Sequence, residues 1–478
     1  MLPSHWKNAN LGEVADYFNG RAFKPKEWKE KGLPIIRIQN LNNEDSPYNF
    51  SDEIFEERYL VKQGELLFSW SASLGAYLWK GKDAWLNQHI FKVLPKNFIH
   101  KLYLYYYLEK VTKELYAKAH GSGMVHVTKK KFEETVIPLP PLPEQRAIVS
   151  KIEHLFSELD NGIANLKLIQ EQLKVYRQAV LKKAFEGELT KKWREQQTDL
   201  QDARELLRQI RKEKEEDAKI SGKKLTKVEP LTKDEISKLP RLPDKWLWIK
   251  FGEACNKIFD GTHFSPKNDS QGDFKYITAK NIKEGYLNLS DLSYVTKEDH
   301  YEIFSRCDVK KGDILYIKDG ATAGKACVNP LEEEFSLLSS VGVFRVNEKY
   351  ISPKFIEYYL NAEVTRHQML KNVAGVAITR LTLVKLNNSM LILPPTEEQQ
   401  AIVQEIETRL SVCDKIEQDI EVNLEKAEAL RQSILKKAFE GKLLNENELA
   451  EVRGAEDWEP AEVLLERIKT ERARNGKK

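Results

Sequence analysis

The sequence predicts an α/β (α+β) protein with two globular blocks, two long coiled-coil helices and an internal repeat. Three observations support this prediction. A long segment occurs twice without insertion, apolar residues in both copies follow coiled-coil spacing, and the blocks before the copies share a skeleton of short motifs. At 478 residues the chain is too long for one ordinary core, so two or three domains are expected.

The repeated segment begins with a proline-rich motif and ends with a lysine-rich motif. LPP followed by EQRAIV, at 139–149, returns as LPP followed by EQQAIV at 393–403. LKKAFEG at 181–187 returns at 435–441. Both pairs are 254 positions apart, so the copies stay in register throughout. Such a repeat predicts two copies of one structural unit and a target with two equivalent parts.

Each copy is predicted to contain one long helix, within segments 143–190 and 396–443. Apolar residues recur in steps of three and four, which is the seam of a coiled coil. The predicted helix-packing residues are Ile148, Ile152, Leu159, Leu166, Leu173 and Val180 in the first copy, and Ile402, Ile406, Ile420 and Ile434 in the second. The full pattern also includes Ile169, Tyr176, Ile416 and Leu430.

The ends of these helices carry recognisable signals. Thr396 with Gln399 three residues later predicts a capping box, and Gly187 and Gly441 predict left-handed C-caps. A helix of about 44 residues is roughly 65 Å long. A helix of this kind needs something to pack against, and the other copy is the obvious partner.

The blocks before the helices, 1–142 and 242–395, are each predicted to fold as one mixed α/β domain. They share LP with a nearby tryptophan near each start, NG at 19–20 against DG at 260–261, and VKQGELLF at 61–68 against VKKGDILY at 309–316. Short apolar runs bounded by Gly, Asn and Asp indicate strands and turns. Because the helices repeat closely and the blocks only loosely, we expect a common frame that carries two different recognition surfaces.

Two charged segments complete the chain. Residues 191–241 form a predicted linker and residues 444–478 a predicted C-terminal tail, and each contains a short helix. The two short helices echo one another in sequence: Ala203, Leu206, Leu207 and Ile210 against Ala461, Leu464, Leu465 and Ile468. A solvated tail and a partner-docking element are equally good interpretations of these helices.

The composition excludes several classes of protein. No run approaches the roughly 18 apolar residues that span a bilayer, and no signal-peptide pattern is seen, so no membrane partner is expected. The four cysteines include no CxxC pair, so neither a zinc site nor a disulfide framework is indicated and a reducing cytoplasm is the expected location. A formal charge of +3 means that any nucleic-acid surface must come from local patches.

The sequence carries no recognisable catalytic motif. Walker A, HExxH and GxSxG patterns are not found, and neither is the Asn/Asp-Pro-Pro-aromatic tetrapeptide expected of an amino-methyltransferase. Glu65 and Asp313 follow glycines at predicted strand starts, where a carboxylate is more often a turn former than a nuclease ligand. The sequence therefore predicts a binding protein rather than an enzyme, with no bound metal.

Taken together, the doubled order of motifs resembles the specificity subunit of type I restriction–modification systems, over nearly the whole chain. The motifs are LPxxEQ…IV…LKKAFEGxL after each block, NGRAF at 19–23, GELLFSWSASLG at 64–75 and NQHIFKV at 87–93 in the first block, and DGTHFSP at 260–266 and GDIL at 312–315 in the second. None is specific alone, but their order, repeated twice, is.

The resemblance implies a non-catalytic DNA sequence-specificity subunit of an adenine-N6 methyltransferase and type I endonuclease complex. Each block would be a target recognition domain that reads one half of a bipartite double-stranded DNA target through the major groove. The two helices would pack antiparallel, set the spacer and dock two modification (methyltransferase) subunits, and two restriction (translocase and nuclease) subunits would complete the assembly. S-adenosylmethionine, ATP and Mg are expected on those partners, and no cofactor on this chain.

Candidate DNA contacts follow from the chemistry of readout. Arg and Lys recognise guanine and Asn and Gln recognise adenine, while Lys, Arg, Ser and Thr contact phosphates. The candidates in the first block are Arg21, Lys24, Arg37, Gln39, Asn40, Ser69, Ser71, Ser73, Lys129, Lys130 and Lys131. Those in the second block are Thr262, His263, Lys267, Lys280, Asn281, Lys318, Thr322, Lys325 and Arg380.

Two alternatives stay open on the sequence. A coiled-coil protein-interaction scaffold without DNA recognition predicts no salt-sensitive duplex binding. A recognition subunit that serves methylation alone, without a restriction partner, has the same sequence pattern. The bases read and the length of the spacer do not follow from the sequence of the blocks.

Overall fold

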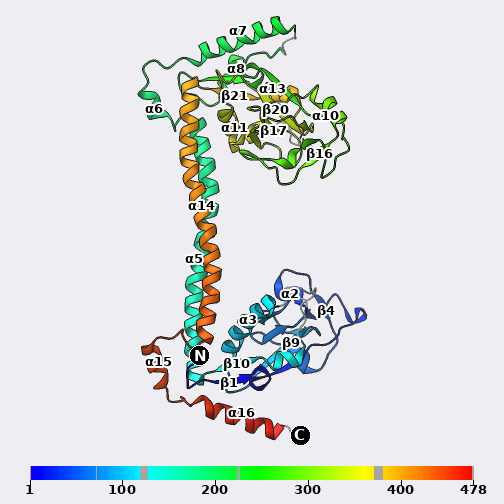
Figure 1. Cartoon of the computed structure of the whole chain (residues 1–478), viewed down its shortest axis with the longest axis vertical. Coiled ribbons are helices and arrows are strands. Elements are labelled where there is room, and N and C mark those ends of the chain that lie inside the picture. The colour runs from blue at the N-terminus through cyan, green and yellow to red at the C-terminus, as the bar shows by residue number, and fades with distance from the viewer. Residues whose placement is uncertain (1, 72, 119–127, 223–226, 371–379, 476–478) are drawn as a thin grey trace. The chain divides into compact units, whose positions relative to one another are not determined.

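The computed structural model describes the chain except for residues 1, 72, 119–127, 223–226, 371–379 and 476–478. It divides into two compact units. Unit 1 comprises Met1–Lys167 and Glu421–Lys478, and unit 2 comprises Leu168–Ile420. Each unit holds one α/β block and one end of each long helix (Figure 1). The predicted fold class is confirmed, with two mixed α/β domains, two long helices and an internal repeat.

The first block is built from ten strands and four short or medium helices within its described residues. The strands are β1 (Lys7–Asn10), β2 (Ala15–Asn19), β3 (Leu33–Ile36), β4 (Asn49–Ser51), β5 (Leu60–Val61), β6 (Leu66–Ser69), β7 (Gly75–Leu78), β8 (Ala84–Leu86), β9 (Ile90–Pro95) and β10 (Val136–Leu139). The α-helices are α1 (Leu11–Val14), α2 (Ile38–Asn42), α3 (Lys101–Lys118) and α4 (Lys129–Glu133).

The second block follows the same order with its own insertions. Its strands are β11 (Leu247–Lys250), β12 (Lys257–Asp260), β13 (Phe274–Ile277), β14 (Ile282–Lys283), β15 (Tyr286–Leu287), β16 (Ser293–Val295), β17 (Ile314–Ile317), β18 (Ala326–Val328), β19 (Ser336–Leu337), β20 (Val341–Arg345) and β21 (Met390–Leu393). Its helices are α9 (Phe251–Ala254), α10 (Lys297–Phe304), α11 (Pro353–Asn361), α12 (Glu363–Leu370) and α13 (Leu383–Asn388).

The sheet topologies of the two blocks match. A four-stranded sheet has the order β2-β9-β6-β7 in the first block and β12-β20-β17-β18 in the second. A second sheet, β4-β3-β8-β5, corresponds to β16-β13-β19, and the pair β1-β10 corresponds to β11-β21. Each four-stranded sheet carries buried aromatic side chains. These include Phe68 and Phe91 in the first block and Tyr316 and Phe344 in the second. The loose sequence resemblance therefore reflects one shared architecture.

The long helices are α5 (Leu142–Phe185) and α14 (Thr396–Phe439), each of 44 residues. They run antiparallel within each unit. In unit 2, Arg177 of α5 binds Asp414 and Glu417 of α14, both at 2.8 Å. Closer to the end of α5, Leu181 shares a core with Ile402 near the start of α14. As the residue numbers of one helix rise, those of its neighbour fall.

Unit 1 repeats this pairing in the same register. Arg431 of α14 forms an ion pair with Asp160 of α5. These two residues lie 254 positions from Arg177 and Asp414, the repeat length of the sequence. An arginine–aspartate pair thus marks the equivalent level of the helix pair in each unit.

The predicted seam is buried at many of its positions but not at all of them. Ile148, Ile152, Leu173, Val180, Ile402, Ile406, Ile420 and Ile434 are buried, whereas Leu159 and Leu166 are half-buried. Four further residues of the pattern are exposed: Ile169 (38%), Tyr176 (45%), Ile416 (38%) and Leu430 (51%). The prediction that the seam is continuous through these four positions was therefore wrong, because two helices alone do not cover them.

The helix ends agree with the sequence in part. Gly187 (φ 77°) and Gly441 (φ 71°) have the left-handed conformation predicted for C-caps. The predicted capping box is wrong. Thr396 donates its hydroxyl to the carbonyl of Tyr350, and the side-chain amide of Gln399 donates to Pro394 instead of turning back to a cap. Both side chains attach the helix to the block beside it.

The charged segments contain α6 (Lys191–Glu195), α7 (Ala203–Ser221), α8 (Lys233–Ser237), α15 (Glu446–Arg453) and α16 (Ala461–Asn475). Leu206 and Ile210 of α7 are buried in the core of unit 2, and Leu464 and Ile468 of α16 are buried in the core of unit 1. The sequence left two interpretations of these short helices open, a solvated tail and a partner-docking element. Neither describes their buried faces, which pack against the blocks of this chain.

Candidate nucleic-acid interface

The loops at one end of each four-stranded sheet gather most of the predicted contact residues. In the second block, antiparallel pairing sets Asp260 opposite Gly342 and Ile317 opposite Val341. The end of β12, the end of β17 and the start of β20 therefore meet at one end of the sheet, which we call the loop end. Arg380 joins it through a bridge to Asp319.

The first block has an equivalent loop end. Asn19 at the end of β2 pairs with Phe91, and Ser69 at the end of β6 pairs with Ile90 and Gly75. Beyond these ends, Arg21 forms a bridge with Asn87. Lys129 reaches the same sheet, because its Nζ donates to the carbonyl of Tyr17 at 2.8 Å.

At the loop end of the second block, basic and acidic side chains alternate. Lys318 is buried (2% exposed), and its Nζ lies 3.3 Å from Oδ2 of Asp260 and 3.0 Å from Oδ2 of Asp319. Outside this core, His263 Nε2 lies 3.4 Å from Asp260 Oδ1, and Arg380 Nε lies 3.9 Å from Asp319 Oδ2. The order is histidine, aspartate, lysine, aspartate, arginine. We call these five residues the charge chain.

The two ends of the charge chain face solvent. The side chains of His263 and Arg380 are 63% and 64% exposed. The remaining predicted residues of these loops differ in exposure: Thr322 is exposed, Lys325 is half-buried and Thr262 is buried. The structure therefore presents two donors to solvent, and the carboxylates behind them are held by a buried lysine.

The loop end of the first block is organised around Arg21. Its Nη2 donates to Oε1 of Glu27 at 2.6 Å, and its guanidinium lies 4.2 Å from the ring centroid of Phe55. The hydrogen bond from Arg21 lowers the pKa of Glu27 to about 2, with help from the backbone N–H of Lys24. Lys24 itself is exposed. Arg21 is thus a fixed cation rather than a freely moving side chain.

Besides Lys318 and Thr262, three further predicted DNA contacts are buried inside the blocks. Asn40 and Asn281 are each 1% exposed, and each accepts a hydrogen bond at 3.1 Å from the backbone N–H three residues earlier, of Arg37 and Thr278 respectively. Ser69 is fully buried and donates to the carbonyl of Ser73. These geometries correct the prediction for the three side chains, because each is used to shape a loop.

The other candidates do not belong to the charge chain. Arg37 is half-buried and Gln39 exposed at the start of α2, and Lys280 is exposed and pairs with Asp291 at 3.1 Å. The remaining positions are Lys267, Lys130 and Lys131, which are exposed, and Ser71 and Ser73, which are half-buried. Whether any of them contacts DNA stays a prediction.

Sequence reasoning missed the carboxylates of the loop ends. Asp260, Asp319 and Glu27 were not candidates, because readout was expected from donors. A signal was present, since Asp260 and Asp319 each precede a glycine at a strand end. Asp260 is the last residue of β12, and Asp319 lies two residues after β17. The turn roles predicted for Glu65 and Asp313 are confirmed, as their carboxylates accept from the backbone N–H of Lys62 and Lys310 at 2.8 Å.

The repeated EQ motif attaches each block to its helix. Glu144 accepts from Nε1 of Trp6 at 2.9 Å, and Glu398 accepts from Nε1 of Trp246 at 2.7 Å. Each following glutamine, Gln145 or Gln399, donates to the carbonyl of a proline at 2.9 or 3.0 Å. Both glutamates and both glutamines are buried. We call each Trp–Glu pair with its glutamine a clamp.

The glycine that ends each long helix completes the attachment. A side chain at Gly187 would place its Cβ 2.5 Å from Pro243, and one at Gly441 would place it 2.4 Å from Pro3. Each block therefore meets the start of one long helix through the clamp and the end of the other long helix through this glycine.

Among the described residues, no group of three or more His, Cys, Asp or Glu side chains is placed to hold a metal ion. Of the helices in the described ranges, none is both long and apolar enough to cross a membrane.

Comparison with known proteins identifies the repeated unit. A family model described as the type I restriction modification DNA specificity domain matches residues 3–169 and 243–426. The EcoBI specificity subunit of Escherichia coli is 28% identical over 481 residues, covering 99% of this chain and 94% of that protein. The MjaVIII specificity subunit of Methanocaldococcus jannaschii is 24% identical, covering 93% and 95%.

Solved structures share the fold. One of them comes from a study of complex assembly and conformational transition of the type I R-M system. Its chain aligns with a TM-score of 0.62 at 19% identity, and the alignment covers 93% of this chain and all of that one. The HsdS subunit from Thermoanaerobacter tengcongensis aligns with a TM-score of 0.51 at 19% identity, over 92% and 98%. A scaffold unrelated to DNA recognition is not favoured by these findings. Because the two matched segments span most of the chain, the protein belongs to the family of the type I restriction modification DNA specificity domain and carries two copies of that domain.

Proposed function

We propose that this chain is the sequence-reading subunit of a type I restriction–modification complex and that its two blocks read the two halves of one bipartite DNA target. The observation that carries the proposal is the doubled unit. One topology occurs twice, attached by the same clamp, with a different set of polar side chains at each loop end. Two different surfaces on one frame suit an asymmetric target with two half-sites.

The chemistry of the loop ends supports DNA as the target. Arg21 in the first block and Arg380 in the second are cations that neighbouring carboxylates position at strand ends. An arginine can donate two hydrogen bonds to guanine in the major groove, and loops at strand ends can reach base edges there. Exposed lysines such as Lys24 and Lys130 provide positive charge for phosphates.

We further propose that the antiparallel helices set the spacer between half-sites. Each long helix passes from one unit to the other, and each unit holds its two helix segments with an arginine–aspartate pair. In this proposal the number of residues between those pairs would set the separation of the two half-sites. A frame of fixed length would select one separation between half-sites.

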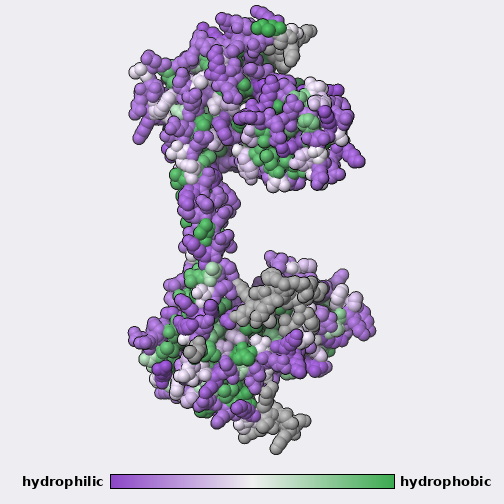
Figure 2. All heavy atoms as spheres, viewed as in Figure 1, coloured by the Kyte–Doolittle hydropathy of each residue, from purple (hydrophilic) through white to green (hydrophobic). Residues whose placement is uncertain are grey.

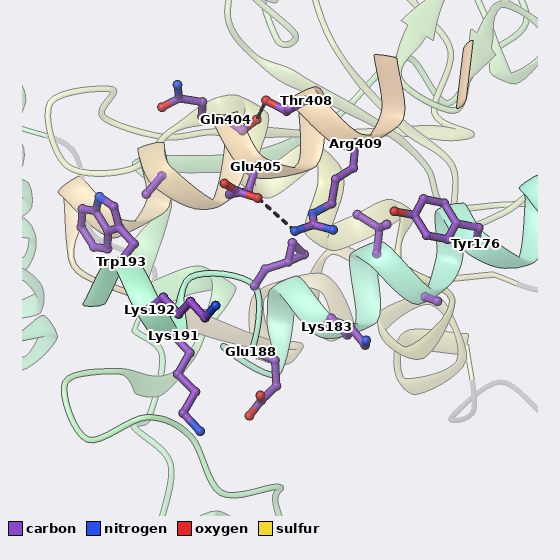
Figure 3. A pocket seen from close by; sticks show the side chains of 14 residues that line it. Tyr176, Lys183, Glu188, Lys191, Lys192, Trp193, Gln404, Glu405, Thr408 and Arg409 are labelled. Atoms are coloured by element: carbon purple, nitrogen blue, oxygen red, sulfur yellow. Dashed lines mark hydrogen bonds and ion pairs between the residues drawn. The ribbon is translucent and has the colours of Figure 1, made fainter. Parts of the chain in front are cut away.

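The partners would dock on grooves between the helices, one in each unit. The groove of unit 2 has a volume of about 800 Å³. Figure 3 shows Tyr176 and Lys183 from α5, Glu405 and Arg409 from α14, and Trp193 from α6 around it. Its lining combines aromatic, apolar and charged side chains, which suits a protein partner.

Unit 1 has a groove at the equivalent positions. It is lined by Leu430, Lys437 and Leu443, which lie 254 positions after Tyr176, Lys183 and Leu189 of the other groove. Its volume is about 510 Å³. Exposed apolar residues of the helices continue beyond the grooves, for example Leu168 and Val422, and Figure 2 shows apolar side chains among hydrophilic ones along the helices. Two equivalent grooves support two copies of one partner.

In this proposal the chemistry belongs to other subunits. Two modification subunits would hold S-adenosylmethionine and methylate adenine N6, and two restriction subunits would use ATP and Mg. This chain would select the sequence on which they act. A complex with modification subunits alone would use the same grooves and the same loop ends.

The test is a methylome measurement. The chain is expressed with its neighbouring modification subunit in a host without other adenine methylation, and N6-methyladenine is mapped by long-read sequencing. We expect one bipartite motif with two half-sites and a fixed spacer, absent when this chain is omitted. An active modification subunit that methylates the same sites with and without this chain would refute the proposal.

A second experiment tests the spacer role separately. Four residues are inserted between Asp160 and Arg177 in α5 and four between Asp414 and Arg431 in α14, which lengthens both helices by about 6 Å each. We expect unchanged half-sites with a spacer longer by about one to two base pairs, given a rise of about 3.4 Å per base pair. Insertion in α5 alone is the control, since it moves the two helices out of register. Unchanged spacing in the double insertion would refute the ruler role.

A further inference from the structure

We infer that Asp319 and Arg380 act together as a base-reading pair for one G·C base pair in the half-site of the second block. Arg380 would donate to O6 and N7 of guanine, and Asp319 would accept from the N4 amino group of cytosine. This inference rests on the proposed DNA-reading function. It assigns a specificity role to Asp319, an acidic residue, and a base type to Arg380.

Backbone geometry places the two side chains together. Asp319 and Arg380 face each other in an antiparallel bridge, and the N–H of Leu381 donates to the carbonyl of Lys318 at 3.0 Å. The guanidinium Nε lies 3.9 Å from Oδ2 of Asp319, close enough for attraction but too far for a hydrogen bond. With its side chain 64% exposed, Arg380 keeps its hydrogen-bonding donors available for a ligand.

The carboxylate of Asp319 is held on one side and unsatisfied on the other. Lys318 Nζ binds its Oδ2 at 3.0 Å. Oδ1 has no hydrogen-bond partner within the described residues. A buried acceptor without a partner is rare in native proteins and calls for an explanation. Although Oδ1 itself is buried, the side chain is 18% exposed, so rotation of the carboxylate can present an oxygen to an amino group that approaches the loop end.

The charge balance favours a base over a phosphate. Two carboxylates, Asp260 and Asp319, lie within the charge chain beside Arg380. A phosphate oxygen brought to Arg380 would meet the repulsion of Asp319, whereas cytosine N4 is a donor that the same carboxylate attracts. The major-groove edge of a G·C pair presents acceptors and this donor side by side, which matches an arginine beside an aspartate.

Among its described residues, the first block has no equivalent pair. The positions that match Asp260, Lys318 and Asp319 in the aligned strands are Asn19, Trp70 and Ser71. No lysine flanked by two carboxylates is built there. The effect of changing Asp319 or Arg380 is therefore confined to one half-site.

The experiment uses the full chain with its modification partner and maps methylation for three variants, Arg380→Ala, Arg380→Lys and Asp319→Asn. For Arg380→Ala we expect about 10- to 100-fold loss of preference at one G·C position of a single half-site, from the usual value of a bidentate contact. Arg380→Lys should relax the same position less, and Asp319→Asn should relax selection at that position while the other half-site stays unchanged.

Matched controls come from a second arginine–aspartate pair. Arg241 and Asp244 lie 4.0 Å apart and are 93% and 96% exposed, where the linker joins the second block and outside the loop end. Arg241→Ala and Asp244→Asn should leave the motif unchanged. Thermal unfolding of each purified variant identifies any loss of fold, and Asp319→Asn, which keeps the shape of the side chain, remains informative if Arg380→Ala unfolds.

Two outcomes would overturn the inference. In one, Arg380 variants weaken methylation evenly at all sequences. The slope of log affinity against log salt for duplex binding then also falls by about one, as for the loss of a phosphate contact. In the other, all three folded variants keep full selection at every position. A wild-type complex that methylates without any bipartite motif would instead refute the proposed function.

Discussion

The two blocks are alike at the clamps, where they contact the long helices, and different at their loop ends. The clamps use the same residue types in both, with Glu144 bonded to Trp6 and Glu398 bonded to Trp246. The loop ends share neither residue types nor charge pattern, since Arg21 stacks on Phe55 in one and Lys318 lies between two aspartates in the other. Attachment and recognition therefore use separate parts of each block, since the clamp lies beside the two-stranded pair and the loop end belongs to the four-stranded sheet. The loops can change without disturbing the frame.

The largest expected effect comes from exchanging one whole recognition surface. Replacing residues 15–135 with those of a relative leaves Trp6, β1, β10 and the clamp of unit 1 in place. We expect one half-site to change completely, with the other half-site and the spacer kept, as read by methylome sequencing. A change in both half-sites would show that the blocks do not read independently.

The clamps are expected to differ in strength although they match in geometry. Glu398 also binds Arg194 at 2.8 Å and Thr190 at 2.7 Å, while Glu144 adds only the half-buried His5 at 2.9 Å. Glu398→Ala should destabilise unit 2 by about 3–5 kcal/mol, because it leaves a partly buried arginine without its carboxylate. Glu144→Ala should destabilise unit 1 by about 1–3 kcal/mol.

Hydrogen-exchange mass spectrometry measures this difference, because it reports protection in each unit separately. Glu397→Ala is the matched control, since its side chain is an exposed neighbour of Glu398 on the same helix. Equal losses of protection from Glu398→Ala and Glu144→Ala would contradict the ranking of the clamps.

The ion pairs that mark the helix register should contribute little to stability. Their acidic partners are exposed, Asp414 at 69% and Asp160 at 62%. Arg177→Ala and Arg431→Ala should each cost at most about 1 kcal/mol. Double-mutant cycles with Asp414→Ala and Asp160→Ala measure the pair energies, and values well above this limit in either unit would show that register depends on the pairs more than on apolar packing.

The smallest expected difference is a pH dependence of unit 2. Burial raises the pKa of Asp308, but hydrogen bonds from Lys257 and Arg345 lower it to about 2, below its ordinary value of 3.8. The ionised carboxylate therefore stabilises the β12–β20 pair above about pH 4, and this stabilisation is lost as the pH falls toward 2. The first block has Leu94 at the position of Arg345.

Acid sensitivity can be compared strand by strand. Between pH 6 and pH 3 we expect amide protection in the β12–β20 pair to fall more than in the β2–β9 pair, by a free energy of about 1 kcal/mol or less because Asp308 is partly solvated. Asp308→Asn should remove the difference. An equal fall in both strand pairs would assign the acid response to other groups.

The sequence predicted the frame well because repetition and periodicity are properties of the chain itself. The repeat spacing of 254 residues located both long helices, and the glycines at 187 and 441 located their ends. It failed where a side chain serves a distant partner. Thr396 has the spacing of a capping residue, yet its hydroxyl bonds Tyr350, which lies 46 residues away.

The candidate site could be predicted by loop but not by side chain. Arg21, His263 and Arg380 lie at loop ends as a reading surface requires, whereas Asn40 and Asn281 turn inward to hold their own backbone. Asparagine has the right chemistry for either role, and only the local hydrogen bonds decide. The acidic members of the charge chain were missed because readout was expected from donors. Their basic partners come from three separate loops, which the sequence alone does not bring together.

The core of unit 1 can close only after the last part of the chain has been synthesised. Its core joins Tyr103 and Leu108 from the first block with Phe439 and Ile468 from the far end of the chain. The first block therefore leaves the ribosome long before its core is closed, whereas unit 2 is one continuous stretch that can fold as it emerges. A chain that stops shortly after residue 420 would retain unit 2 and leave the apolar surface of the first block open to aggregation.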